Sequence, residues 1–424
     1  MRRFNAGKFG RAGLCVMLGL ASWQPIIRAD DGSTNSEQRI DRLEEENREL
    51  RDRLDRIEAK ETNTTGSAAA GLPGALNLLS QMQVSGYITA SYFYDSPTPG
   101  PGGTVSDGLS FTRYHDSFTL NAVSLTLQKL VKNNGEDWDI GYRVELIYGA
   151  NAPDVDNVPD FHYAGIREAY MDVNIPVGNG LDFRAGQLIS LLNFESGDQV
   201  LNPNFSQGNQ WYFTGNPPDT GVQLGYNIND QIDVKVRLQN GLYSGVIANS
   251  SGKTLMGRIG FRPDDKTSIA LFGFGGPQGA NDTHDWTDGS SLIATRDLTS
   301  QLHAATEIDY FHAQGGNPIT GGDAQWWSGG GWLWYDFTKK VDLAFRGDYV
   351  DDVNGGGTSG LLGFPTNAGQ EIYSFTGTLN LTQHTKFATF QFRPEIRYDH
   401  TTLAEGFNGH NERVSAGVGV GMMF

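Results

Sequence analysis

The chain has 424 residues with a formal net charge of −17; 55 residues are glycine and 11% are aromatic. The acidic balance argues against a nucleic-acid partner, because phosphate binding needs clustered lysines and arginines, and the aromatic content argues against a disordered chain. Beyond the N-terminus no run of about 18 apolar residues occurs, which excludes a membrane-spanning helix. Two classes remain: a secreted β-solenoid or β-sandwich array, and a membrane β-barrel.

Residues 1–29 predict a signal peptide. Basic residues precede the apolar run 14–21, which is too short to span a bilayer. The small-residue rule allows cleavage after Ala29 or after Ala21. The single cysteine, Cys15, lies inside this segment, so we expect the mature chain to hold no disulfide. The protein is therefore predicted to be exported.

Residues 37–60 predict a short periplasmic coiled coil. Apolar residues recur alternately three and four apart while charged residues fill most other positions, which is the heptad pattern. The alternative is a single solvated charged helix, since three heptads are close to the minimum. Residues 61–83 then form a linker rich in Thr, Gly and Ala. The predicted coiled-coil core consists of Ile40, Leu43, Asn47, Leu50, Leu54 and Ile57.

From residue 84 to the end the apolar pattern changes to a period of two. In the segment 138–148 every even-numbered residue is apolar or aromatic, and most residues between them are charged. The pattern returns in 232–239, 341–349 and 390–398. Such strands have one apolar and one charged face, which suits a soluble sandwich as well as a membrane barrel with a charged lumen.

The connections between these strands distinguish the two folds. Short polar turns alternate with long loops rich in Gly, Asn, Asp and Pro, which is typical of an outer-membrane barrel. We therefore predict that residues 84–424 form an all-β membrane barrel of about 16 antiparallel strands, with both termini in the periplasm. The turns lie near 133–136, 176–179, 229–231, 263–266, 299–301, 338–340 and 382–385, and the loops near 96–116, 150–162, 191–218, 244–252, 276–288, 314–324, 352–369 and 400–411.

Aromatic residues in segments 92–94 and 326–337 predict the girdles that flank the lipid-facing band of such a barrel. Two residues do not fit the predicted strands. Pro394 removes a backbone donor inside a strand and predicts a bulge there. Arg167 has the parity of lipid-facing residues, so it must lie at or beyond the outer interface unless the register shifts by one residue.

The terminal Phe424 closes an apolar-alternating strand and looks like the barrel-assembly signal of Gram-negative outer-membrane porins. Short motifs within the barrel segment resemble the OmpL-like β-barrel porin family: Arg167-Glu168-Ala169-Tyr170, Gly186-Gln187, Glu195, Asn204-Phe205-Ser206 and Pro217-Pro218-Asp219-Thr220-Gly221-Val222. The resemblance implies a location in the outer membrane of a Gram-negative-type bacterium. It also implies outer-membrane lipid and the barrel-assembly machinery as partners, and a homotrimer.

The resemblance also implies that the loop 191–218 folds into the lumen, where Glu195 and Asp198 would be its charged members. Acidic loop residues facing basic strand residues would produce a transverse field at the constriction. Alternatively, any one of these charges only keeps the lumen hydrated and paired. By strand parity the further pore-lining candidates are Arg143, Glu145, Arg184, Lys235, Arg237, Arg346, Asp348, Arg393, Glu395 and Arg397.

The function predicted from these features is passive diffusion of small hydrophilic solutes or ions through an outer-membrane porin. Two alternatives stay open: a plugged barrel that serves as an envelope tether or adhesion platform, and an anion- or phosphate-selective porin. The acidic external loops predict a weak cation preference at low salt. The sequence carries no catalytic motif, and neither a cofactor nor a metal site is predicted.

Overall fold

The computed structural model describes residues 80–424 except 110, 156–163, 216–217, 243, 249, 278–283, 318–319 and 356–368. The predicted signal peptide and coiled coil, and nearly all of the predicted linker, lie outside the described residues. No helix in the described part of the chain is both long and apolar enough to cross a membrane.

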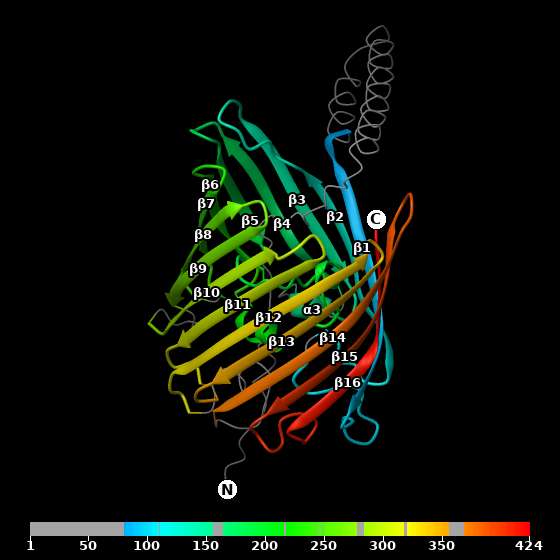
Figure 1. Cartoon of the computed structure of the whole chain (residues 1–424). Coiled ribbons are helices and arrows are strands. Elements are labelled where there is room, and N and C mark those ends of the chain that lie inside the picture. Colours follow the sequence, from blue (N-terminus) through cyan, green and yellow to red (C-terminus); the bar gives the residue numbers. More distant parts are fainter. Residues whose placement is uncertain are drawn as a thin grey trace, which may run out of the picture. The chain divides into compact units, whose positions relative to one another are not determined.

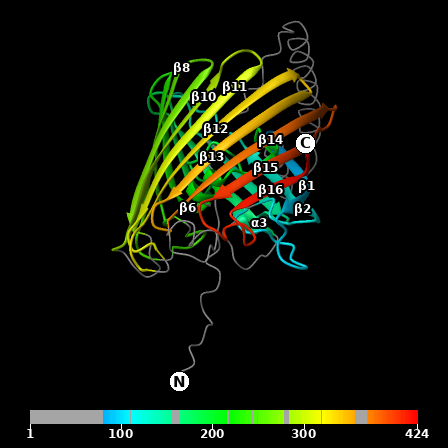
Figure 2. The same cartoon turned by 60° about the horizontal axis from the view of Figure 1, so that its bottom comes forward.

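Among the described residues, sixteen antiparallel strands form one closed barrel in which β1 pairs with β16 (Figures 1 and 2). The predicted strand number and closure are confirmed. The strands are β1 (Gln83–Ser96), β2 (Ser117–Lys129), β3 (Asp139–Tyr148), β4 (Ala164–Ile175), β5 (Leu181–Leu188), β6 (Asp219–Asn227), β7 (Ile232–Gln239), β8 (Thr254–Asp264), β9 (Thr267–Pro277), β10 (Trp286–Asp297), β11 (Leu302–Ala313), β12 (Ala324–Thr338), β13 (Val341–Asp352), β14 (Gln370–His384), β15 (Thr389–Thr401) and β16 (Glu412–Met423).

Side chains alternate between the two faces of the wall, as the period of two predicted. On β13 the Phe345 side chain is 52% exposed on the outside, whereas its neighbour Arg346 is 2% exposed inside. Large apolar side chains are similarly exposed on the outer face of other strands, for example Leu271 and Ile396. An apolar outside around a polar inside is the arrangement of a membrane barrel and the reverse of a soluble sandwich.

Short and long connections alternate along the chain as predicted. The turn between β8 and β9 is only residues 265–266, whereas the loop between β5 and β6 spans 189–218. One predicted turn is misplaced: β14 continues to His384, and the turn follows at 385–388. Its backbone is closed by a hydrogen bond of 2.8 Å from the Thr385 amide to the Ala388 carbonyl, and the Ala388 amide donates to the Thr385 hydroxyl.

Four of the predicted girdle aromatics face inward instead: Phe93 on β1 and Trp326, Trp332 and Trp334 on β12. Trp326 and Trp332 occupy even positions of β12, share the inner face with Ser328, and are 6% and 3% exposed. Trp327 and Phe337 lie at odd positions and are exposed on the outer face. The prediction from clustering alone was therefore wrong for half of the cluster, because alternation along a strand divides adjacent aromatics between both faces.

A β-bulge explains the parity of Arg167. Glu145 of β3 pairs with Glu168 of β4, but the next residue, Leu146, pairs with Ile166, so Arg167 is the extra residue. The bulge turns Arg167 to the inside, where it is 1% exposed. Of the two predicted possibilities, the shift of register by one residue is therefore confirmed, and the position at the outer interface is not. Pro394 shows the opposite result, because the register between β14 and β15 is unchanged across it and no bulge forms.

The loop between β5 and β6 folds into the barrel, where Figures 1 and 2 show it behind the near wall. It contains the 3₁₀ helix η1 (Gln199–Leu201) and the short helix α4 (Asn209–Thr214). Helix α4 contacts β11, β12 and β13, and η1 contacts β16. A further helix, α3 (Ala152–Val155), lies in the loop between β3 and β4. We call residues 189–218 the inner loop.

The end of the chain contributes to closure of the barrel. Phe424 and Gly86 exchange two backbone hydrogen bonds of 3.0 Å, which extend the ladder between β1 and β16. We expect deletion of Phe424 to reduce the fraction of protein that migrates as a compact, heat-modifiable barrel in unboiled gels. Phe424→Tyr is the control, because it keeps both backbone bonds and the aromatic ring. An unchanged compact fraction in the deletion variant would refute a role for this residue in assembly.

Candidate functional site

The inner loop crosses the lumen from β5 to the wall formed by β11–β16. At its start, Arg237 of β7 donates a hydrogen bond of 2.6 Å to the Ile189 carbonyl. Farther along, the Phe194 amide donates to Glu307 of β11, and the Phe205 amide donates to Glu395 of β15. The described part of the loop is thus bonded to both sides of the barrel.

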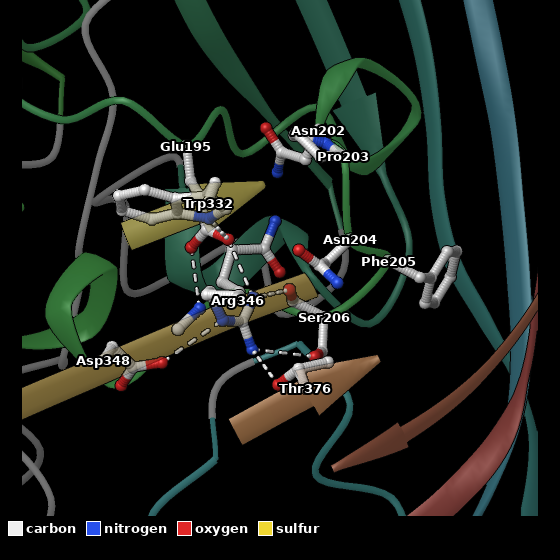
Figure 3. Close-up of polar contacts among 12 residues, drawn as sticks. Glu195, Asn202, Pro203, Asn204, Phe205, Ser206, Trp332, Arg346, Asp348 and Thr376 are labelled. Atoms are coloured by element: carbon white, nitrogen blue, oxygen red, sulfur yellow. Dashed lines mark hydrogen bonds and ion pairs between the residues drawn. The ribbon is translucent and has the colours of Figure 1, made fainter. Parts of the chain in front are cut away.

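Arg346 on β13 is the main contact between this wall and the inner loop (Figure 3). Its Nη1 donates to Glu195 Oε1 at 2.7 Å and also to the Ser206 carbonyl. Its Nε lies 3.2 Å from Asp348 Oδ2, and Nη2 donates to Thr376 Oγ1 at 2.8 Å. Buried ion pairs of this kind are stable only with good geometry and additional hydrogen bonds, and Arg346 has both.

Two arginines of β15 bind the carbonyl groups of the inner loop. Arg393 donates to the carbonyls of Gln199 and Asn202, both at 2.6 Å, and Arg397 donates to the Gln207 carbonyl at 2.7 Å. An irregular segment inside a barrel has carbonyl groups that no helix or sheet satisfies, and each would be costly to bury unbonded. These guanidinium groups supply the missing donors.

On the β4 side of the barrel, Asp198 connects the inner loop to the bulge. Its carboxylate is paired with Arg167, whose Nη1 also donates to Glu145 Oε1 at 2.8 Å. The Gln187 side chain donates to the Ile166 carbonyl at 2.8 Å and so supports the bulged backbone. Burial raises the pKa of the Asp198 carboxyl above its ordinary value, although the Arg167 guanidinium acts in the opposite direction.

Apolar contacts complete the packing of the inner loop. Trp211 of α4 is 1% exposed and its ring lies 4.8 Å from that of Phe111. The Phe205 ring lies against Gly419 of β16, where an added Cβ would come within 2.2 Å of the ring. Phe205 also stacks 6.1 Å from Phe93 of β1, and the Arg393 guanidinium lies 5.7 Å from its ring.

The structure places the predicted pore-lining residues in two groups, all on the inner side of the barrel. The first group is almost fully buried and makes up or adjoins the contacts of the inner loop: Glu145, Glu195, Asp198, Arg237, Arg346, Asp348, Arg393, Glu395 and Arg397. The second group, Arg143, Arg184 and Lys235, lies on β3, β5 and β7 and stays partly accessible from the lumen.

The accessible wall is polar and mostly charge-paired. Arg143 Nε lies 2.6 Å from Glu168 Oε2, and Arg184 Nη2 lies 3.2 Å from Asp172 Oδ2. The Arg184 guanidinium also lies 5.2 Å from the Tyr170 ring centre. This surface offers hydrogen-bonding groups of both charges, without a large apolar area, to a solute in the lumen.

Several residues of the site were not among the predicted pore residues. Asn204 donates to Thr378 Oγ1 at 2.7 Å, and Trp332 Nε1 donates to Glu195 Oε1 at 3.1 Å. Arg413 on β16 donates to Asp399 Oδ2 at 2.7 Å. Inward parity alone would have identified Trp332 and Arg413. Among the described residues, no group of three or more His, Cys, Asp or Glu side chains has a metal-binding arrangement.

A family model described as putative beta-barrel porin-2, OmpL-like, matches residues 81–424. No curated protein sequence matches the chain significantly. Among solved structures, the chain is similar to the outer membrane channel DcaP of Acinetobacter baumannii, with 13% identity and a TM-score of 0.53 over 81% of this chain and 97% of that one.

Two further porins cover 81% of this chain and 99% of their own length. They are the anion-selective porin from Comamonas acidovorans, with 8% identity and a TM-score of 0.54, and a trimer form of OmpT of Vibrio cholerae, with 9% identity and a TM-score of 0.50. At such identities the likeness shows the fold alone.

The Arg346 contacts predict that this side chain holds the inner loop in place. We expect Arg346→Met to destabilise the seated loop by about 3–5 kcal/mol, because it leaves the buried carboxylates of Glu195 and Asp348 without their cation. Faster thermolysin cleavage within residues 189–218 would report this change. Adding Glu195→Gln to the same variant should recover part of the loss. Equal cleavage rates in the wild type and the Arg346→Met variant would contradict the assignment.

Proposed function

The chain belongs to the OmpL-like beta-barrel porin-2 family of the Gram-negative outer membrane, and on that basis we propose that it is a passive diffusion channel for small hydrophilic solutes. The observation that carries the proposal is a loop fixed across the lumen beside a wall that stays polar and partly accessible. Such an arrangement narrows a barrel and leaves hydrogen-bonding groups along the remaining path. We propose no enzymatic role and no cofactor.

Fixed geometry favours a channel over a moving lid. The inner loop is bonded to side chains of β4, β7, β11, β13 and β15, and most of these contacts involve buried charges. Breaking one buried pair costs several kcal/mol, so the loop does not leave the lumen spontaneously on the time scale of diffusion. Solutes are then selected by size and polarity at a constriction of constant shape.

One observation favours the plugged barrel as a second candidate. Apolar side chains of the inner loop, including Leu191, Leu192, Trp211 and Phe213, form a packed cluster with Phe272, Phe311 and Trp326 of the wall. This cluster lies inside the barrel, where it excludes water. A barrel closed at this level throughout would serve as an envelope tether or adhesion platform and would pass no ions.

Planar-bilayer recordings of the full mature chain separate the two candidates. A porin gives stable open steps in single-channel current, and we expect a larger step after residues 199–213 are replaced by a short Gly-Ser linker. The matched control is Lys253→Gln, a charge removal in the exposed loop between β7 and β8. If the wild type gives no steps while the loop-replaced variant conducts, the barrel is plugged and the diffusion proposal fails.

We further propose a homotrimer in which the heptads at residues 37–60 join the subunits. An apolar stripe of three short heptads is marginal in a single helix and gains stability by burying its side chains against copies of itself. The OmpT structure in trimer form supports this assembly for a barrel of similar fold.

Removal of the heptads tests their role. A chain with the signal peptide joined directly to residue 84 should still insert, but its oligomer should dissociate at lower temperature in detergent. Each buried Leu or Ile contributes at most about 1.5–3 kcal/mol to the bundle. The control variant changes Asn47 to Ile, which should make the oligomer more stable. Identical dissociation temperatures for the truncated and full chains would exclude a role in assembly.

A further inference from the structure

Two cationic side chains lie directly opposite each other on the inner wall. Lys235 of β7 is the register partner of Arg258 of β8, and both occupy inward positions. Like charges in this relation are destabilising, since directly opposed Cβ atoms are only about 5 Å apart. Elsewhere on this wall, Arg143 and Arg184 each have a carboxylate within 3.2 Å.

Each of the two cations has at least one hydrogen-bond donor without an acceptor among the described residues. The Lys235 ammonium makes no hydrogen bond and no ion pair with any residue that the structure describes, although its side chain is partly accessible. Arg258 is 4% exposed, and its Nη1 is paired with Asp233, but its Nε has no partner. A buried guanidinium N–H without an acceptor is costly, so this donor is available to an acceptor that enters the site.

Glycines beside the pair make space for the charged side chains around it. Gly225 of β6 is the other register partner of Lys235 and presents no side chain to the lumen. At Gly260, two residues beyond Arg258, an added Cβ would come within 2.7 Å of Arg258 Nη1 and still closer to Asp233 Oδ1, so this glycine accommodates their ion pair. A polar cleft of about 750 Å³ at the rim with the short turns reaches Asp233 and Arg262, next to this pair. A solute in this cleft therefore meets Asp233, the carboxylate that pairs with Arg258.

The charges near the pair limit what it can hold. Besides Arg258 and Arg184, the carboxylates of Asp233 and Asp182 act on Lys235. Asp172 also pairs with Arg184, and Arg262 also pairs with Asp233. Four cations and three acids leave a small positive excess, which suits one small anion and not a polyanion. An ammonium and a guanidinium side by side offer donors to two oxygen atoms of one carboxylate or inorganic oxyanion.

We propose that Lys235 and Arg258 form a binding station for small oxyanions, either carboxylates or inorganic oxyanions, on their way through the barrel. This assignment rests on the proposed channel function and gives that channel a substrate class. It also revises the weak cation preference predicted from the acidic loops. Those loops set the charge of the mouth, whereas this pair lies deeper on the wall.

Binding to the folded protein in detergent tests the station directly. Equilibrium dialysis at low ionic strength would measure sulfate and succinate in separate arms, which distinguishes an inorganic oxyanion from a carboxylate. We expect Lys235→Gln to weaken binding about tenfold or more, because hydrogen bonds between charged groups are of that strength. Lys235→Arg should restore most of the affinity, and Lys253→Gln should leave it unchanged.

Reversal potentials in a salt gradient provide a second readout. The wild type should prefer anions more than the Lys235→Gln variant does, with heat-modifiable migration showing that each variant is folded. If neither anion binds, or if Lys235→Gln binds both as tightly as the wild type does, the station is refuted even when the channel conducts. If the anions bind but the wild type gives no open steps, the station stands and the proposed channel function fails.

Discussion

The need to bond every backbone carbonyl inside the barrel governs this structure. The inner loop has little regular structure, so its carbonyl groups need donors from elsewhere. Arg393 and Arg397 provide them from β15 and Arg237 provides one from β7, while Arg346 adds an ion pair to Glu195. These donors lie on strands, which are rigid, and so they fix the shape of the loop. The constriction of the lumen is a consequence of this hydrogen bonding.

Much of the fold could be predicted because the barrel repeats two local rules. Alternation along each strand gave the inner and outer faces, and alternation of short and long connections gave sixteen strands. The predictions failed at positions where a single residue departs from one of these rules. The bulge at Arg167 reverses its parity; a charge at lipid-facing parity marks the position in the sequence, but it does not show that a bulge is the cause. Adjacent tryptophans such as Trp326 and Trp327 point to opposite faces although they form one cluster in the sequence.

The charged residues of the site could be predicted as inward-facing but not in their roles. Parity gives the face of Arg346 and Arg393, but it cannot show that a loop far away in sequence covers them. Counting charges therefore overestimates the charge that is exposed in the lumen, since the arginines of β13 and β15 are paired with other groups of the protein. Lys235 looks no different from them in the sequence, and only the paired structure sets it apart.

The position of Phe205 links the packing of the inner loop to the order of steps in barrel folding. Its ring lies between Phe93 of the first strand and Gly419 of the last, directly over the seam where the two ends of the sheet meet. This pocket does not exist until both strands are side by side. The inner loop can therefore complete its packing only after the sheet has closed, and a half-assembled wall leaves that aromatic ring without its site. Closure of the sheet therefore comes before the final narrowing of the lumen.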